Sequence, residues 1–122
     1  MPQPTSAPDP ATEQFVPSLT IVIPAYNEAE NLPLVLPPAI EFVRSQCRDG
    51  RLLIVDDGSV DGTPQVPSAY AADPHVRLLR HPQNRGLTAT LRTGFYAADS
   101  EYVTWIPADG QTPLSELKKI LM

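Results

Sequence analysis

Oxygen-bearing side chains follow an apolar stretch late in the chain, at Asp109 and Gln111 on either side of Gly110. The preceding residues 102–106 have the composition of a buried strand. Carboxylate and amide oxygens are ligands for Mg²⁺ or Mn²⁺, and such a cation would neutralise a diphosphate leaving group. A polar turn between a strand and a helix accounts for the same residues, and this segment alone does not decide between the two interpretations.

A second acidic segment, Asp56-Asp57-Gly58-Ser59, follows the apolar run 51–55. Two adjacent acids at the end of a buried strand cost free energy unless they face solvent, a ligand or a partner group. A carboxylate there can accept a hydrogen bond from a ribose hydroxyl or a base N–H, and the glycine lets a ligand approach the backbone. A turn closed by an aspartate side chain explains the segment equally well.

Other polar residues give weaker indications. Tyr26 and Glu28 could form a wall for a base or a ribose, and an ordinary surface turn accounts for them equally. His75 and His81 each lie beside a proline, and we interpret both as loop residues rather than ligands. Arg85, next to a glycine, could reach a phosphate, but a solvated arginine is the simpler interpretation.

Composition limits the classes of protein. The chain has 122 residues, enough for one domain, and its formal net charge of −5 argues against nucleic-acid binding. The single cysteine, Cys47, excludes an internal disulfide and a metal site built from cysteines. No apolar run approaches the ~20 residues of a membrane span, and the N-terminus lacks the pattern of a signal peptide. A cytoplasmic chain is therefore expected.

The elements that must position these residues alternate along the chain. We expect strands at 19–23, 51–55, 76–79 and 101–106, and helices at about 31–50, 63–72, 87–98 and 112–121. Alternating strands and helices predict parallel pairing through right-handed crossovers. The fold class is therefore α/β, a three-layer sandwich with a mainly parallel sheet. Residues 1–18, with five prolines, are expected to be a disordered tail.

Some details of these elements can also be predicted. Pro37 and Pro38 should kink or divide the first helix, and Thr63 is expected to cap the second. The third helix should pack through an apolar face, and Trp105 should lie in the core. An exposed edge strand is expected, so the chain either forms a homodimer or is a portion of something longer. The residues expected on that apolar face are Leu87, Leu91, Phe95 and Ala98.

Three segments together resemble glycosyltransferase family 2, which has the GT-A fold. They are IVIPAYNEAENLP (21–33), LLIVDDGSVDGT (52–63) and NRGLTATLRTGFYAADSEYVTWIPADGQTP (84–113). Their order and spacing are most similar to the dolichol- and polyprenyl-phosphate sugar transferase branch. The resemblance implies that residues 19–122 are a nucleotide-diphospho-sugar-binding domain, the Rossmann-like half of a GT-A fold, apparently truncated.

The resemblance also implies roles for individual residues. The nucleotide and donor sugar would be met by Pro24, Tyr26, Glu28, Val55, Asp56, Asp57 and Asp109. Asp109 and Gln111 would help to hold Mg²⁺ or Mn²⁺ and the diphosphate. The family's acidic motif is Asp-x-Asp, and Pro107 stands here in place of its first aspartate. Loss of that carboxylate should weaken the hold on the cation, because both metals prefer several oxygen ligands.

The function implied by the resemblance is transfer of a sugar, with inversion, from a UDP- or GDP-linked donor to an acceptor such as polyprenyl phosphate. A peripheral position at the inner membrane face would suit that acceptor. The alternative is a non-enzyme, a nucleotide-sugar-binding or regulatory module that kept the fold and lost catalysis. Pro107 and the missing second half of the family's domain favour this alternative, and the sequence leaves activity open.

Overall fold

The computed structural model describes residues 16–110 and 114, and it confirms the predicted α/β order of elements. The elements are β1 (Val16–Ala25), α1 (Leu32–Gln46), β2 (Cys47–Asp56), α2 (Gln65–Ser68), β3 (Val76–Arg80), α3 (Leu87–Ala97) and β4 (Tyr102–Trp105). The predicted tail up to residue 15 and the predicted helix 112–121 lie outside the described residues, apart from Leu114. None of the described helices is long and apolar enough to cross a membrane.

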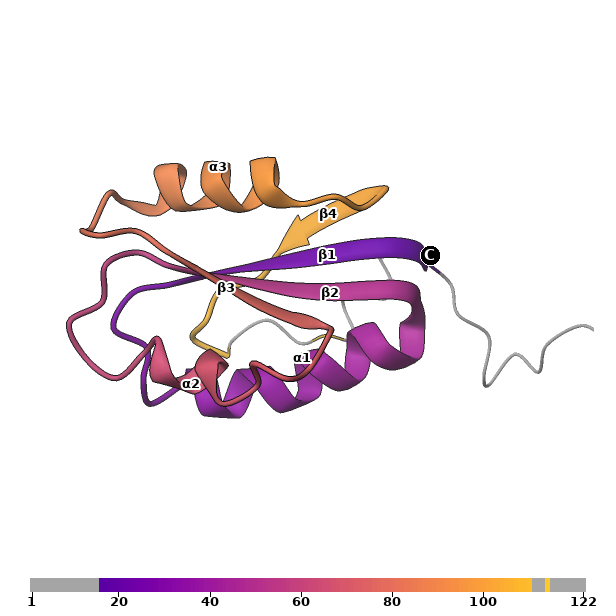
Figure 1. The fold of residues 1–122 in the computed structure, drawn as a ribbon, viewed down its shortest axis with the longest axis horizontal. Helices are drawn as coiled ribbons and strands as arrows, with labels where there is room; N and C mark the ends of the chain where they lie inside the picture. The colour runs from indigo at the N-terminus through magenta and orange to yellow at the C-terminus, as the bar shows by residue number, and fades with distance from the viewer. Residues whose placement is uncertain (1–15, 111–113, 115–122) are drawn as a thin grey trace, which may run out of the picture.

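The four strands form one parallel sheet in the order β3-β2-β1-β4. Helices α1 and α2 cover one face and α3 covers the other, which confirms the three-layer sandwich (Figure 1). Alternate residues of the central strands therefore enter different layers. Ile23 and Ile54 pack in the larger core beneath α1, whereas Val22 and Val55 pack in the smaller core beneath α3.

Strands β1 and β2 are longer than the apolar runs that predicted them. Pairing begins at Val16 with Cys47, so β1 starts inside the segment that was assigned to the tail. At the other end, β1 continues through Pro24 to Ala25. The Val22 carbonyl accepts a hydrogen bond from the Ile106 N–H, so it points toward β4. The ring nitrogen of Pro24, two residues further on, points to the same side of β1, beyond the end of β4. No ladder bond is lost there, which is why the proline is tolerated.

The two prolines in α1 do not divide it, contrary to one of the predicted outcomes. Pro37 and Pro38 lie inside one helix of 15 residues, and both are exposed. The carbonyls that lose their donors belong to Pro33 and Leu34, which are also exposed and can be hydrated. Burial of the opposite face, including Leu36, holds the helix together despite the missing bonds.

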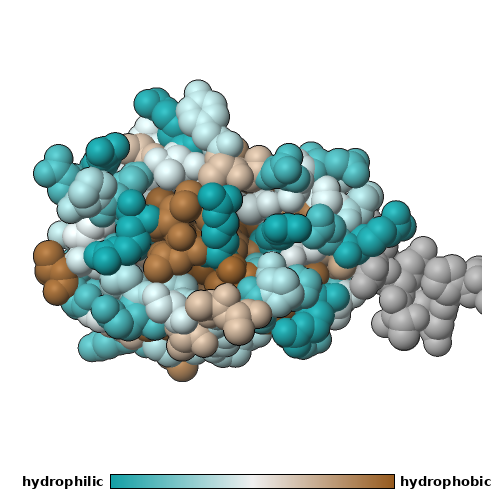
Figure 2. All heavy atoms as spheres, viewed as in Figure 1, coloured by the Kyte–Doolittle hydropathy of each residue, from teal (hydrophilic) through white to brown (hydrophobic). Residues whose placement is uncertain are grey.

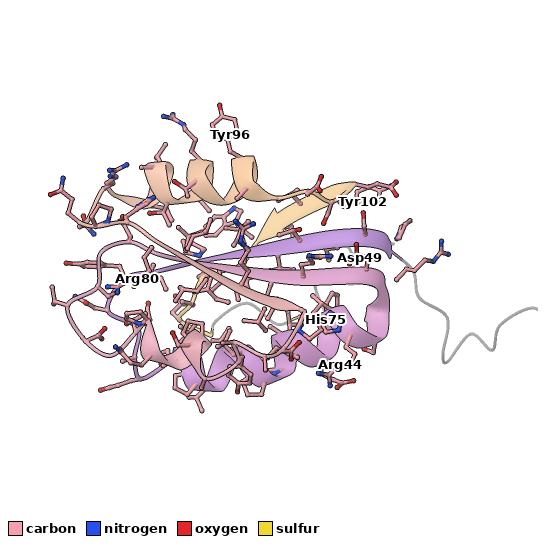
Figure 3. All side chains as sticks on the ribbon, in the orientation of Figure 1. Arg44, Asp49, His75, Arg80, Tyr96 and Tyr102 are labelled. Carbon is pink, nitrogen blue, oxygen red and sulfur yellow. The ribbon has the colours of Figure 1, made fainter. Side chains whose placement is uncertain are left out.

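Helix α3 begins at Leu87 as predicted and ends one residue early, and its predicted packing face is confirmed only in part, by Leu91, which packs against the smaller core. Leu87 and Phe95 are 54% and 44% exposed, and the buried positions are Thr90 and Gly94. A Cβ atom on Gly94 would collide with Val22, so the small residue allows the helix to approach β1 closely. Close approach selects small side chains, whereas the prediction counted only apolar ones. On the opposite side of this helix, Tyr96 points away from the sheet (Figure 3).

The two outer strands are more exposed than the central pair. Trp105 is 38% exposed, so its predicted place in the core is wrong, because β4 lies at the edge of the described sheet. Pairing of a second copy at this edge stays a prediction. On the opposite edge, the β3 residues Leu78 and Leu79 are half-buried. Figure 2, in the orientation of Figure 1, shows apolar residues gathered in the middle of the visible face of the molecule, with hydrophilic residues around them.

Candidate functional site

The polar segments singled out in the sequence meet at one edge of the sheet. Because all four strands are parallel, the residues that follow β1, β2, β3 and β4 lie at the same end. Arg80 marks this end in Figure 3, and His75 and Asp49 mark the other. In open α/β sheets, ligands bind beyond the carboxyl ends of the strands. This end is therefore where a ligand is expected.

A shallow pocket of about 220 Å³ opens here on the α3 side of the sheet. It brings together three of the predicted residues, Pro24, Tyr26 and Asp57. The first turn of α3 and the loop before it complete the wall. The full lining is Pro24, Ala25, Tyr26, Asp57, Asn84, Gly86, Leu87 and Thr90.

The carboxylate of Asp57 is the centre of this pocket wall. One oxygen accepts hydrogen bonds from His81 Nδ1 at 2.8 Å and from the Arg85 backbone N–H at 2.9 Å. The other accepts from Asn84 Nδ2 at 3.1 Å and from the Gly86 N–H at 2.8 Å. Four donors match the roughly four lone-pair positions of a carboxylate. The loop before α3 is thereby wrapped around a single side chain of β2.

These contacts control the ionisation of Asp57. Burial alone would raise the pKa of this carboxyl, because it is only 4% exposed. The hydrogen bonds from His81, Arg85 and Gly86, with the charge of His81, outweigh burial and hold its pKa below the ordinary value. The side chain is therefore a carboxylate near neutral pH and acts only as an acceptor.

His81 is the main residue of this network that the sequence prediction missed. It was assigned to an ordinary loop, but it is 6% exposed and its two ring nitrogens contact Asp57 and Thr93. These partners are 24 and 12 residues away in the chain, so no local pattern reveals them. Arg85 is exposed, as predicted, and its described contribution to the network is its backbone N–H.

Asp56 and Val55, the other predicted residues of β2, are fully buried. Asp56 accepts hydrogen bonds from the Ser59 N–H at 3.2 Å and from Arg80 Nε at 3.3 Å through one oxygen. Its Oδ1 atom has no hydrogen-bond partner among the described residues. The side chain of Val55 packs in the core beneath α3, so a ligand would meet only its backbone.

A second set of contacts joins the loops after β1 and β2. The backbone N–H groups of Asn27 and Glu28 donate to the hydroxyls of Ser59 and Thr63, each at 2.8 Å. Asn27, at φ +55°, returns a bond by accepting from the Val60 N–H at 3.0 Å. These bonds fix the loop that carries Tyr26 and Glu28 against the loop that carries Asp57.

Thr63 joins this set instead of capping a helix. Helix α2 covers only four residues, and no side chain caps it. The Thr63 hydroxyl instead donates to Asp61 while it accepts from Glu28. Hydrogen bonds from the side chain and backbone of Thr63 lower the pKa of Asp61, and burial opposes them only in part.

Asp109 lies in a different pocket from Asp57. That pocket, of about 400 Å³, is formed between α1 and the segment after β4. Asn31 also lines it and donates to the carboxylate of Glu28 at 2.9 Å. Gln111, the other predicted metal ligand, lies outside the described residues.

The donor atoms described at the end of β4 do not fit a complete metal site. Among residues 16–110 and 114, no three His, Cys, Asp or Glu side chains gather as a metal site requires. Pro107 leaves Asp109 as the single carboxylate of the 107–110 segment, whereas Mg²⁺ and Mn²⁺ prefer several oxygen ligands. Substrate oxygens would have to supply most of the coordination.

The fold defines the class of the protein: it is a GT-A fold like those of glycosyltransferases. Residues 20–122 match the family model described as glycosyl transferase family 2, and the chain belongs to that family. Among solved structures, the mannosyltransferase PcManGT from Pyrobaculum calidifontis, in complex with GDP-Man and Mn²⁺, is similar with a TM-score of 0.66 and 26% identity. That match covers 86% of this chain and 32% of the other.

Two curated relatives show the same partial coverage. A dolichyl-phosphate beta-glucosyltransferase of Dictyostelium discoideum is 30% identical over 110 residues, which cover 84% of this chain and 34% of the relative. An undecaprenyl-phosphate 4-deoxy-4-formamido-L-arabinose transferase of Proteus mirabilis is 31% identical over 113 residues, with coverages of 91% and 35%. The chain thus spans about a third of the length of the curated relatives it matches.

Proposed function

We propose that this chain is the donor-binding part of a family 2 glycosyltransferase. Its donor is a UDP- or GDP-linked sugar, and its acceptor is a polyprenyl phosphate presented at a membrane face. The polyprenyl-phosphate specificity is supported by the names of the two curated relatives. The nucleotide-sugar donor is supported by PcManGT, which was solved with GDP-Man.

The observation that carries the proposal is the pocket that joins Pro24, Tyr26 and Asp57 at the carboxyl ends of β1 and β2. Tyr26 is 45% exposed, so its ring is available to a base or ribose. The pocket is small and open on one side. It suits part of a nucleotide, with the sugar and diphosphate extending toward the end of β4.

In the proposed reaction, an oxygen of the acceptor phosphate attacks the anomeric carbon of the donor sugar. The bond from that carbon to the nucleoside diphosphate breaks in the same step, and the configuration inverts. A phosphate nucleophile is already ionised near neutral pH, so the described residues need not supply a base. The family's acidic motif supports Asp109 as the residue that would meet a cation or the diphosphate, and we assign no step to a cation.

The alternative is a module that binds a nucleotide sugar without transferring it. Pro107 supports this alternative, because it removes a carboxylate from the family's acidic motif. Binding alone is common to both functions. Metal-dependent sugar transfer to polyprenyl phosphate distinguishes them.

A thermal-shift titration with UDP and with GDP, each with and without Mn²⁺, tests the proposed donor site. Ligand at 100 times its dissociation constant should stabilise the chain by about 2.7 kcal/mol. We expect one nucleotide to raise the melting temperature, and we expect Pro107→Asp to enlarge the part of that increase that depends on Mn²⁺. A melting temperature that neither nucleotide moves, in either protein, would contradict the proposal.

A further inference from the structure

We propose that His81 is a positioning residue for donor binding, acting through Asp57 and Thr93. The inference rests on the proposed function, since it concerns the same pocket. His81 itself does not line that pocket. It lies behind Asp57 and connects β2, β3 and α3 at the place where they meet.

The carboxylate of Asp57 links β2 to the loop before α3. All four hydrogen bonds to this carboxylate come from residues 81–86, which link β3 to α3. Asn84 and Gly86, which donate two of these hydrogen bonds, also line the pocket proposed to bind the nucleotide. The position of the pocket wall therefore depends on the orientation of one carboxylate. Without His81, the remaining donors to this carboxylate, Asn84, Arg85 and Gly86, would all come from the loop before α3.

His81 provides the contact to this carboxylate that comes from the residue directly after β3. Its backbone N–H donates to the Asp56 carbonyl at 2.8 Å, which fixes the residue to the end of β2. Its Nδ1 then donates to Asp57, because an ionised carboxylate can only accept. The backbone N–H of His81 thus fixes this residue to the end of β2, and its ring holds the Asp57 carboxylate in place.

The second ring nitrogen extends this anchor to α3. Nε2 lies 2.8 Å from Thr93 Oγ1, and the same hydroxyl lies 3.0 Å from the carbonyl of Ala89. Thr93 precedes Gly94, the residue that packs against β1. The helix whose first turn forms one wall of the pocket is thus tied to Asp57 through this imidazole as well as through the Gly86 N–H.

The charged groups around His81 come from each neighbouring segment. Asp57 contacts it directly, and Arg80, the preceding residue, is paired with Asp56 through Nε. The described contact from the loop is the backbone N–H of Arg85, which donates to the same Asp57 oxygen. His81 is therefore the residue that carries a side-chain bond from the sheet to this carboxylate.

Two readouts test the assignment in the full 122-residue chain. The first is the chemical shift of the Arg85 and Gly86 amides, whose bonds to a carboxylate should move them downfield. The second is affinity for UDP and GDP by titration calorimetry. We expect His81→Ala to shift both amides upfield and to weaken nucleotide binding by about tenfold, which corresponds to about 1.4 kcal/mol.

His81→Asn is the rescue variant, because its amide nitrogen can replace Nδ1 as a donor to Asp57. It should restore the two amide shifts and most of the affinity. Thr93→Val should loosen α3 and give an intermediate loss, whereas Thr88→Val, on the exposed side of the same helix, should change neither readout. His75→Ala, at the opposite end of the sheet, is the matched histidine control (Figure 3).

The possible outcomes separate this inference from the proposed function. If wild-type protein binds neither nucleotide, the proposed donor site fails, while the amide shifts still report whether His81 positions Asp57. If His81→Ala folds and leaves the amide shifts and the affinity unchanged, the inference is wrong. If His81→Ala does not fold, Thr93→Val decides in the same way, and equal behaviour of Thr93→Val and Thr88→Val would overturn the inference.

Discussion

At the scale of single residues, Asp57 shows how a carboxylate can organise a pocket before any ligand arrives. Its four donors are satisfied only by the ionised form. An acid that follows an apolar run is visible in the sequence, which is why Asp57 could be predicted as a site residue. Its partner His81 could not, because burial and long-range contacts decide its role.

Replacing Asp57 with asparagine should destabilise the chain in a pH-dependent way. The folded-state pKa of Asp57 is lowered, so its stabilisation is fully present above the unfolded value of about 3.9 and is lost as the pH falls through the folded value. At pH 7 we expect Asp57→Asn to cost about 1–3 kcal/mol, because hydrogen bonds to a charge are lost. Below about pH 4 the difference from wild type should shrink.

Urea unfolding of both proteins between pH 3 and pH 7 measures this difference. Asp99→Asn, at an exposed position, is the control and should stay within about 0.5 kcal/mol of wild type. A stability gap for Asp57→Asn that is the same at every pH would show that the charge of Asp57 does not contribute.

At the scale of elements, apolar patterns predicted the strands and the starts of α1 and α3, but not the short length of α2 or the whole packing face of α3. The residues around Ile21 and Ile54 are buried on both faces of the sheet. Such strands are apolar at nearly every position, so the sequence predicts them directly. In α3 the packing depends on Gly94, a residue that carries no apolar signal. Thr63 failed as a predicted helix cap because a distant loop competes for its hydroxyl.

Gly94→Ala should destabilise the contact between α3 and β1. The added methyl group would overlap Val22, so the helix must move away, at a cost of about 1–3 kcal/mol. Gly62→Ala is a matched control, because the atoms nearest to its new Cβ are 3.8 Å and 4.0 Å away. Chemical denaturation of the two variants gives the comparison, and equal stabilities would contradict the close packing of α3.

Thr63→Val should open the connection between the loops after β1 and β2. Valine keeps the shape but removes the acceptor for the Glu28 N–H, which costs about 1–3 kcal/mol for a buried group. Thr63→Ser keeps the hydroxyl and should retain most of the stability. Hydrogen exchange of the Glu28 amide reports the bond directly; exchange as slow in Thr63→Val as in Thr63→Ser would rule out this role.

At the scale of the whole molecule, the parallel sheet explains why residues far apart in sequence share one edge. Strand order β3-β2-β1-β4 places Tyr26 and Asp57 side by side, because β1 and β2 are neighbours. Alternation of strands and helices was sufficient to predict this class of fold. It was not sufficient to predict that Asp109 opens into a separate pocket, since that depends on how the segment after β4 packs against α1.

NMR can test whether the end of the sheet beyond β1 and β2 binds a nucleotide. Amide shifts of ¹⁵N-labelled chain should be followed during titration with UDP and, separately, with GDP. We expect one nucleotide to shift the amides of Tyr26, Asp57, Asn84 and Gly86. Amides around Leu52 and Val76, which line a pocket near the opposite end of the sheet, should not move. Shifts confined to that opposite pocket, or none with either nucleotide, would contradict nucleotide binding beyond β1 and β2.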